Sequence, residues 1–503
     1  MTTHTNSTAA DPVLDLVVDL AMQARRTSPP AEARHAAARM IMDALGCAFG
    51  GYHDDVPALV RAFAGRRPQA GGTHIVGTDL RVSADVAAFT NAVMVRYLDL
   101  NDTYVSTAGV GHPSDYIPAV LSAAETAGPI PGQDVLDGVV LTYEVFCRLT
   151  DVTRLGVERW DHVLNGAVAS AVGAAHVLAL PPEHLRHAVA LALVPNVALQ
   201  ATRLNDVSMW KGCASGNAAR NALVAVELAA DGLTGPAQPF TGRGGLFAAL
   251  GHEPHFGAWH RDASAILSCD VKQFPAGYFS QSAVQAALDL RGPDLPLDEV
   301  TKVEVGTFAF GVNVMAGDRE KWAPATRETA DHSLPYVVAH ALSHGRLDAS
   351  SYTAAALTDP QTRFLLDRLT VTQDPDSDRA WPQASRNRVT VRFKDGRHRS
   401  SAVTHYLGHH ANPMTDAQVQ DKFTHQTAPV LGETRTEGLA AAIWALGHGA
   451  ALAPVFEAAG TRDEDTMTNR DQLTIPHGGS GAEPGQRPPG SARTGPAPQS
   501  PRQ

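Results

Sequence analysis

Hydrophobic residues recur at helical spacing through most of the first half of the chain. The pattern is clearest in six segments: 11–26, 30–51, 132–152, 165–181, 182–200 and 216–235. The first segment opens with Asp11 as a candidate N-cap and Pro12 in the first turn. Several of these segments are apolar on most faces and rich in Ala, Gly and Ser, which lets helices pack closely. They are therefore predicted to form the centre of a helical bundle.

The pattern changes to strand-like alternation after Cys269. Residues 300–310 and 388–403 alternate between apolar and polar positions, and the second run contains the hairpin sequence KDGR. Between these runs, residues 332–345 have the spacing of a helix, and residues 372–383 form a Pro- and Asp-rich loop in this prediction. The segment is predicted to be an α+β module.

Helical spacing returns at 415–426 and 436–449. The chain is therefore predicted to be mainly α, with a large helical domain built from its N- and C-terminal parts and a smaller α+β domain inserted between them. The predicted divisions are a flexible N-terminus at 1–11, the helical domain at 12–268 and 409–458, the insert at 269–408 and a tail at 459–503. The tail is rich in Gly, Pro, Ser and Gln and is predicted to be disordered.

Composition narrows the classes of partner. The 503-residue chain has a formal net charge of −11, which argues against nucleic acid and against an anionic membrane surface as main partners. An anionic substrate would need a local cluster of cations. Only six of the 41 basic residues are lysines, leaving 41 − 6 = 35 arginines. Because lysine can lose its proton when buried, a lysine kept in such a chain hints at chemistry, although a surface lysine is the commoner case.

The cysteines and the termini indicate a cytoplasmic protein. The four cysteines form no CxxC pair, so the sequence signals neither a zinc site nor a redox dithiol. The N-terminal residues lack the charged and apolar regions of a secretory signal. The longest apolar stretches are too short or too polar to cross a bilayer. No membrane contact is therefore expected.

Polar and ionisable residues gather in one window, residues 96–125, which includes Asp99, Thr103 and His112. Asp99 and Thr103 are four residues apart, so they would share one face of a helix. His112 opens the sequence GHPSD, a turn that enters the next helix, where free N–H groups favour an anion. The alternative is that this window holds only capping aspartates and a surface histidine.

Other ionisable residues stand at the ends of predicted elements. His162 lies just before an apolar helix, and Lys211 lies in a predicted link before the helix at 216–235. Lys272 lies where the helical spacing gives way to strand-like alternation. Junctions between domains are favoured ligand sites. The sequence DHS, which ends at Ser333, resembles a helix N-cap. The alternative for His162 is a helix cap or a core residue. The alternative for Lys211 is a solvated loop residue, and for Lys272 a hinge residue in a salt bridge.

Familiar motifs of other chemistries are missing from the sequence. It contains no GxGxxG after a strand, no P-loop, no HExxH, no GxSxG and no Cys/His ligand spacing. Nucleotide, zinc and serine-hydrolase chemistry are therefore not the leading hypotheses. What remains is acid–base catalysis by carboxylate, histidine and lysine groups without a cofactor or metal.

Five motifs in order resemble the MmgE/PrpD family: YLDLNDTY…GHPSD, WDHV, WKG…GNAARNA, VKQFPAGYFSQSAV and DHSLPYVVAHAL. The resemblance covers about residues 12–455. It is closer to the 2-methylcitrate dehydratase branch than to the cis-aconitate decarboxylase branch. In the second branch an aspartate would be expected in place of Asn101 and a histidine shortly after Thr103, where this chain has Tyr104 and Val105.

The resemblance implies a lid formed by the inserted α+β domain, a site between lid and helical domain, a homodimer, and no metal or other cofactor. It places six residues in the catalytic site: Asp99, Thr103, His112, Lys211, Lys272 and, less securely, His162. Substrate-binding residues are expected at Asn101, Ser114, Arg203 and Ser333.

The function implied is that of a cofactor-independent lyase, a hydro-lyase that dehydrates 2-methylcitrate or a related hydroxy polycarboxylate in propionate metabolism. His112 is the expected acid or base, Asp99 its partner, and Lys211 and Lys272 the cations that hold a substrate carboxylate. The sequence leaves alternatives open: decarboxylation of a cis-aconitate-like acid, elimination from a specialised natural-product substrate, or a non-catalytic helical scaffold. It fixes neither the stereochemistry nor the residue that removes the proton.

Overall fold

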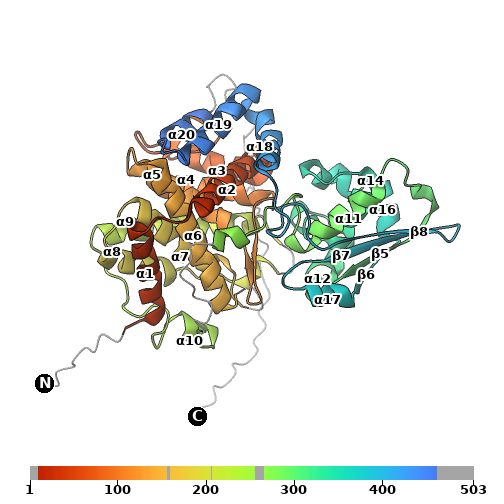
Figure 1. Ribbon diagram of the computed structural model, residues 1–503, viewed down its shortest axis with the longest axis horizontal. Coiled ribbons are helices and arrows are strands. Elements are labelled where there is room, and N and C mark those ends of the chain that lie inside the picture. Colours follow the sequence, from red (N-terminus) through yellow and green to blue (C-terminus); the bar gives the residue numbers. More distant parts are fainter. Residues whose placement is uncertain (1–9, 156–158, 205–206, 255–264, 461–503) are drawn as a thin grey trace, which may run out of the picture. The chain divides into compact units, whose positions relative to one another are not determined.

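A computed structural model describes residues 10–155, 159–204, 207–254 and 265–460 (Figure 1). Helices make up most of this part of the chain and the strands are short, which confirms the prediction of a mainly α fold. The helices are α1 (Pro12–Arg26), α2 (Ala31–Gly50), α3 (Asp55–Gly65), α4 (Ala84–Tyr97), α5 (Ile117–Thr126), α6 (Gly132–Thr153), α7 (Val163–Val177), α8 (Pro182–Leu193), α9 (Trp210–Ala230), α10 (Leu246–Leu250), α11 (Gln281–Arg291), α12 (Ala309–Ala316), α13 (Arg327–Ala330), α14 (Leu334–His344), α15 (Ala354–Leu357), α16 (Pro360–Leu366), α17 (Pro375–Ala380), α18 (Asp416–Leu431), α19 (Glu433–Leu446) and α20 (Ala453–Ala459). The strands are β1 (Thr73–His74), β2 (Arg81–Val82), β3 (Tyr104–Val105), β4 (Val110–Gly111), β5 (Val300–Thr307), β6 (Leu369–Gln373), β7 (Asn387–Phe393) and β8 (His398–Val403).

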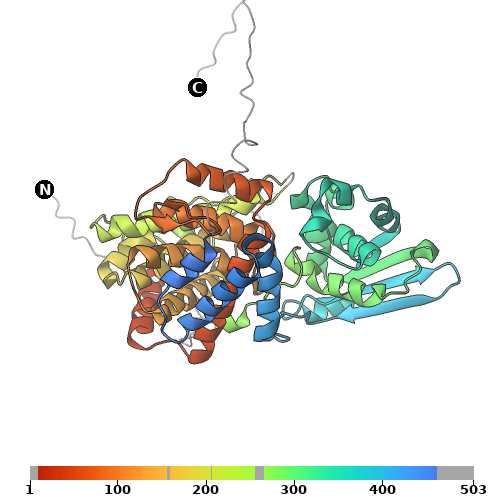
Figure 2. The ribbon, with the colours of Figure 1, turned by 90° about the horizontal axis from the view of Figure 1, so that it is seen from above.

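One hydrophobic core joins the two ends of the described chain. It contains residues of α1, α2 and α4–α9 together with residues of α18–α20. Figure 2 shows the C-terminal helices, in blue, beside the N-terminal helices, in red and orange, and α18 packs against α2. The predicted cap of α1 is present, since Asp11 Oδ1 accepts hydrogen bonds from the main-chain N–H groups of Val13 and Leu14.

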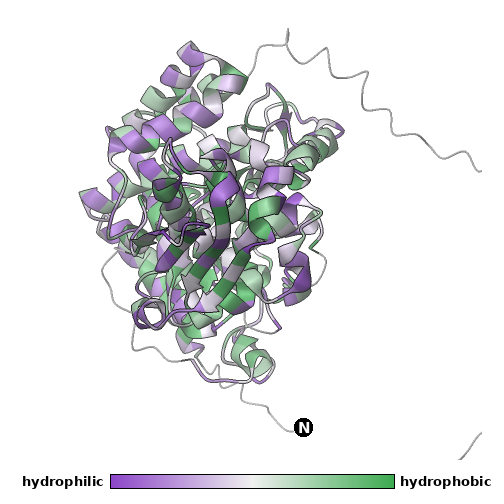
Figure 3. Ribbon diagram, turned by 90° about the vertical axis from the view of Figure 1, so that its right-hand side faces the viewer, coloured by the Kyte–Doolittle hydropathy of each residue, from purple (hydrophilic) through white to green (hydrophobic). Residues whose placement is uncertain are grey.

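A second core lies within residues 274–406. Its sheet has the strand order β6-β5-β7-β8, in which β5 and β6 are parallel and the other pairs antiparallel. Hydrophobic and hydrophilic residues alternate along the strands that face the viewer in Figure 3. The buried side chains of β7, such as Val389 and Val391, face the core that α11 and α14 complete. We call residues 274–406 the lid segment.

The boundaries of three elements differ from the prediction. The helix predicted to start at Gly216 is α9 and starts at Trp210, so Lys211 lies in its first turn instead of in a link. Gly216 does not end the helix because it serves close packing: a Cβ there would lie 2.7 Å from the main-chain oxygen of Phe89 on α4. The predicted Pro- and Asp-rich loop contains α17, which Asp374 caps. Strand β6, which precedes α17, was not predicted.

The predicted tail falls outside the described residues from 461 onwards, as does the predicted flexible N-terminus up to residue 9. The domain boundaries stay predictions. Within the described residues, no helix combines the length and apolar character that crossing a bilayer requires.

Replacing Gly166 with alanine is expected to destabilise the protein by about 1–3 kcal/mol, the usual cost of overpacking a core. A Cβ at Gly166 on α7 would lie 1.8 Å from the ring of Tyr116, whose ring is fully buried. Gly438 on α19 provides the matched control, because nothing lies within 4 Å of its Cβ position. Gly438→Ala should stabilise the helix by about 0.5–1 kcal/mol. Denaturant unfolding measures both, and equal midpoints for the two variants would contradict the prediction.

Candidate active site

A short backbone bridge brings two distant segments together. The main-chain N–H of Thr103 donates to the oxygen of Asp270, and the N–H of Asp270 donates to the oxygen of Thr103, both at 2.8 Å. The first segment follows α4 and carries Asp99, and the second carries Lys272 two residues beyond the bridge. The bridge therefore explains how two side chains 173 residues apart come into contact.

Asp99 is the centre of a buried group of charges. Lys272 Nζ donates to Asp99 Oδ1 at 2.7 Å and to the Asp99 main-chain oxygen at 3.0 Å. Arg96 Nη1 donates to the same carboxylate oxygen at 2.5 Å. The backbone of Asp99 has φ = 52°, a left-handed conformation that is uncommon for a residue other than glycine. Such conformations cluster at functional sites, where the surrounding contacts impose them.

Lys211 of α9 extends this group into the lid segment. Its Nζ lies 2.9 Å from Asp331 Oδ1 and 2.9 Å from His332 Nδ1. The other nitrogen of that ring, Nε2, lies 3.4 Å from Asp99 Oδ2. Lys272, Asp99, His332, Lys211 and Asp331 thus form one chain of contacts from the segment after α4 to the start of α14. We call these five residues the charge network.

A second group of predicted residues adjoins this network. His112 Nδ1 donates to the main-chain oxygen of Asp102 at 2.7 Å and lies 3.3 Å from the hydroxyl of Thr103. Because Nδ1 carries the hydrogen, the neutral ring has its lone pair on Nε2. The His112 and His162 rings meet edge to face with centroids 5.6 Å apart.

His162 is in turn held by Asp161. His162 Nδ1 lies 2.9 Å from Asp161 Oδ1, and Arg203 Nε donates to Asp161 Oδ2 at 2.9 Å. His162 Nε2 and Arg203 Nη2 are buried and have no hydrogen-bond partner within the described residues. Both atoms are therefore polar groups that a bound ligand could satisfy.

Three of the expected substrate-binding residues are occupied by bonds within the protein. Asn101 Nδ2 donates to Ser114 Oγ at 2.9 Å and to Asp115 Oδ1 at 2.8 Å, and Ser114 Oγ donates to Asp102 Oδ1 at 2.6 Å. The hydroxyl of Ser333 caps α14 and donates to the main-chain oxygen of residue 321. These contacts fit a role in holding the loops of the site better than direct contact with a substrate.

Burial and charge set the protonation of the network. Burial alone would raise the pKa of Asp99, but the charges of Arg96 and Lys272 outweigh it and hold that pKa well below its usual range. The pKa of Asp331 falls to about 2, because Lys211 and His332 outweigh the effect of its burial. Burial lowers the pKa of Lys272, and Asp99 opposes that shift. Both carboxyl groups are thus ionised at neutral pH.

The histidines are shifted towards the neutral form. Burial, followed by the charges of Arg96 and Lys272, holds the pKa of His112 well below 6.5. Burial and the charge of Lys211 lower the pKa of His332 to about 4. Both imidazoles are therefore neutral at neutral pH, which is the form that can accept a proton.

Asp99 and His112, the expected catalytic partners, share no hydrogen bond within the described residues. The Asp99 carboxylate pairs with Arg96 and Lys272 and lies 3.4 Å from His332. His112 bonds instead to the loop that contains Asp102 and Thr103. The charges of Arg96 and Lys272 attract the Asp99 carboxylate more strongly than a neutral ring does. The charge of Asp99 still reaches His112, where it opposes the fall of the pKa.

Sequence analysis missed three members of the site: Arg96, Asp331 and His332. Arg96 stands three residues before Asp99, which is a helical contact spacing, and this signal was available. Asp331 and His332 directly precede Ser333. They were missed because the sequence DHS was interpreted only as a helix N-cap.

Two sets of residues have the ligand types of a metal site. Oxygen and nitrogen atoms of Asp99, Asp331 and His332 lie within 4.8 Å of one another, but Lys211 and Lys272 neutralise the two carboxylates and would repel a cation. This set does not fit a metal ion.

The second set is Asp270, His409 and His410. The main-chain N–H and the ring of His410 both bond Asp270 Oδ1 at 2.7 Å. Since His409 Nδ1 accepts the N–H of Ala411 at 3.0 Å, the hydrogen of that neutral ring is on Nε2, which lies 3.7 Å from Asp270 Oδ2. Nε2 therefore offers no lone pair to a metal ion. Asp270 is therefore a hydrogen-bond acceptor for His410, and the set does not fit metal coordination.

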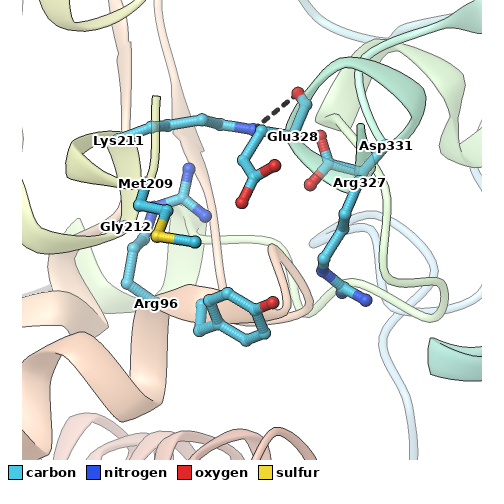
Figure 4. Close-up of a pocket in the computed structure, with 8 residues that line it drawn as sticks. Arg96, Met209, Lys211, Gly212, Arg327, Glu328 and Asp331 are labelled. Carbon is cyan, nitrogen blue, oxygen red and sulfur yellow. Dashed lines mark hydrogen bonds and ion pairs between the residues drawn. The ribbon is translucent and has the colours of Figure 1, made fainter. Parts of the chain in front are cut away.

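A small cavity opens beside the charge network. Eight residues line it: Arg96, Tyr97, Met209, Lys211, Gly212, Arg327, Glu328 and Asp331 (Figure 4). Figure 4 shows Lys211 reaching across from α9 to the lid segment, where its Nζ also lies 3.5 Å from the main-chain oxygen of Glu328. The cavity has a volume of about 10 Å³, which is enough for about one water molecule.

Known proteins resemble this chain over most of its length. Residues 17–258 match the MmgE/PrpD N-terminal domain and residues 274–447 match the MmgE/PrpD C-terminal domain. The 2-methylcitrate dehydratase of Salmonella typhi is 27% identical over 403 residues, which cover 75% of this chain and 82% of that protein. The 2-methylcitrate dehydratase-like protein oryR of Aspergillus oryzae is 28% identical over 451 residues, covering 83% and 89%. The cis-aconitate decarboxylase of Homo sapiens is 25% identical over 430 residues, covering 80% and 85%.

Proposed function

The chain belongs to the MmgE/PrpD family, and we propose that it is a lyase that removes water from a hydroxy polycarboxylate. The proposed substrate is 2-methylcitrate and the proposed product 2-methyl-cis-aconitate. The observation that carries this proposal is the charge network, in which two lysines and a neutral imidazole surround buried carboxylates. The relative of Salmonella typhi that is named 2-methylcitrate dehydratase supports the choice of substrate.

The charges of the network suit an anionic substrate. Arg96, Lys211 and Lys272 bring three positive charges against Asp99 and Asp331. A third carboxyl, Asp115, lies 3.6 Å from Arg96, but burial raises its pKa to about 7, so part of the positive charge is left over at neutral pH. Loss of a proton from the carbon beside a carboxylate places negative charge on that carboxylate. A cation fixed nearby stabilises this charge most when it develops, and this lowers the barrier.

Two proton transfers complete the proposed reaction. His112, neutral and with its lone pair on Nε2, takes the proton from carbon. The departing hydroxyl needs a proton because hydroxide is a poor leaving group, and the proposed source is the ammonium group of Lys211, which lies 2.9 Å from Asp331 Oδ1. Thr103, 3.3 Å from the ring of His112, helps to hold that ring.

The test of the proposal is a panel of acids. Purified, chelator-treated protein would be mixed separately with 2-methylcitrate stereoisomers, citrate and cis-aconitate. Ultraviolet absorbance would follow the unsaturated acid, and mass spectrometry would identify the products. Water loss from 2-methylcitrate, unchanged by the chelator, is the expected result. Failure to convert any of these acids would overturn the proposed substrate and direct the search to specialised substrates.

A second candidate is decarboxylation. The likeness to human cis-aconitate decarboxylase over 80% of the chain favours it. The same panel separates the two functions, since a decarboxylase would release carbon dioxide from cis-aconitate and would leave 2-methylcitrate unchanged.

The homodimer is also part of the proposal, and exposed apolar side chains support it. Large hydrophobic side chains are exposed on the end of α8, on the following link, on α9 and just after it: Val194, Val197, Leu199, Leu204, Met209, Trp210, Val224, Leu228 and Leu233. We call this set the α8–α9 surface. Exposed apolar groups gathered on packed elements are typical of protein–protein contacts. The proposed dimer therefore buries the α8–α9 surface of both copies.

A double variant with Val197→Asp and Leu228→Asp is expected to shift the protein from dimer to monomer, because each new charge would be buried without a partner. Gel filtration with multi-angle light scattering measures the mass. Leu59→Asp, on α3 and 50% exposed, is the control and should leave the dimer intact. A double variant that stays dimeric would remove this surface from the proposal.

A further inference from the structure

The cations that line the cavity are not equally engaged. Arg96 is paired with Asp99 at 2.5 Å, and Lys211 with Asp331 at 2.9 Å. Arg327, the third cation of the lining, has no carboxylate within 4.0 Å among the residues that the structure describes. An unpaired guanidinium on the wall of a small, charged cavity needs an explanation.

Aromatic rings fix the position of this guanidinium. Its carbon lies 5.0 Å from the centre of the Tyr97 ring and 4.9 Å from the centre of the Tyr352 ring. Both distances are within the range of cation–π contacts. Tyr97 is the last residue of α4 and Tyr352 belongs to the lid segment, so Arg327 is held where α4 and the lid segment meet. The side chain has lost much of its freedom before any ligand binds, which lowers the entropy cost of binding.

The donors of Arg327 are incompletely used. One of them, Nη2, donates to the main-chain oxygen of Leu98 at 3.5 Å, which is a long hydrogen bond. The Nε group is buried and has no hydrogen-bond partner in the described part of the chain. A carboxylate that approaches the side of a guanidinium accepts from two N–H groups at once, and would satisfy this donor.

We propose that Arg327 binds a second carboxylate of the substrate, separate from the carboxylate held at Lys211 and Lys272. The inference rests on the proposed function, because it assumes a substrate with several carboxylates. Arg327 is the first residue of α13 in the lid segment, so a polycarboxylate held at both ends would link the lid segment to α9 and to the residues after α4. Arg327 therefore selects acids by the number and spacing of their carboxylates.

Glu328 lines the same cavity and supplies the opposing charge. In Figure 4 its carboxylate points into the space between Lys211 and the lower part of the cavity. A ligand carboxylate placed there would be repelled, whereas one placed at Arg327 would be attracted. Opposite effects are therefore expected at Arg327 and Glu328. Removing the Arg327 charge should weaken polycarboxylate binding, and removing the Glu328 charge should strengthen it.

Calorimetric titration of the full chain tests the inference without turnover. The probes are tricarballylate, which has three carboxylates and no hydroxyl to lose, and glutarate, which is the same chain without the central carboxylate. Wild type should bind tricarballylate more tightly than glutarate. Arg327→Gln should weaken tricarballylate binding about 10- to 100-fold, the usual size of a lost charge-assisted bond, and reduce the preference over glutarate. Glu328→Gln should tighten it.

Arg319→Gln is the matched control, since Arg319 is an exposed arginine of the lid segment outside the cavity lining. It should bind both acids as wild type does. Arg327→Lys keeps the charge but not the fork of donors, and an intermediate affinity is expected; it replaces Arg327→Gln if that variant does not fold. Tricarballylate affinity within two-fold of wild type in a folded Arg327 variant would overturn the inference alone. A wild-type protein that binds neither acid would overturn the proposed function as well.

Discussion

Lys272→Met should lower kcat/KM by about 10²–10³-fold, the usual effect of removing one group that stabilises charge in the transition state. Lys272 is fully buried, and its Nζ lies 2.7 Å from Asp99 Oδ1. Methionine keeps most of the side-chain volume, so the change removes mainly the charge and its hydrogen bonds. Steady-state kinetics with the acid identified by the substrate panel measures the effect.

The control for this variant is Lys302→Met. Lys302 lies on β5, pairs with Glu304 at 2.8 Å and has a side chain that is 47% exposed, so its replacement should change kcat/KM less than two-fold. Melting curves of both variants show whether the buried Asp99, left with Arg96, still allows folding. A folded Lys272→Met protein with near-wild-type turnover would exclude Lys272 from the mechanism.

His112→Asn should lower kcat by about 10²–10⁴-fold, the range for loss of a general acid or base. The amide of asparagine can still donate to the main-chain oxygen of Asp102, so the loop is retained while the titrating nitrogen is lost. The control is His344→Asn at the exposed end of α14, where His344 pairs with Asp359, and no loss of turnover is expected there.

The pH dependence of the wild-type rate provides a second measurement on His112. Burial and the charges of Arg96 and Lys272 hold the His112 pKa well below 6.5. A base loses activity as pH falls through its pKa, because the protonated fraction rises. The rate should therefore stay level as pH falls from 7.5 through 6.5 and decline only in more acidic solution. An acidic limb centred near 6.5 or above would be inconsistent with His112 as the base.

Local patterns predicted the elements well, because each depends on residues close in sequence. The alternation in β5, β7 and β8 and the caps at Asp11 and Ser333 are of this kind. Lys211 was misplaced in a link because glycine usually weakens a helix, whereas Gly216 is used here for contact with α4. That contact belongs to the packed bundle and leaves no local signal.

The pairings of the site could not be predicted in the same way. Lys211 meets Asp331 across 120 positions and Lys272 meets Asp99 across 173. Family motifs pointed to both lysines, but no periodicity states which carboxylate each one would contact. His332 was missed because it looks like part of a capping sequence until the fold places it between Lys211 and Asp99. The roles of all these residues in catalysis stay predictions.

If the proposed substrate binds at the cavity beside the charge network, which has room for about one water molecule, the size of that cavity also limits how fast the substrate is captured. A six- or seven-carbon acid cannot enter that space, so it must meet a less closed arrangement of the same residues. The apparent affinity for the acid would then be its intrinsic affinity multiplied by the fraction of protein molecules in that less closed arrangement. In a stopped-flow experiment, the binding rate would level off with rising acid concentration at the rate of opening, far below the diffusion limit. The contacts that close the cavity, above all the ion pair of Lys211 with Asp331, would then affect the rate of substrate binding as well as the rate of the chemical step.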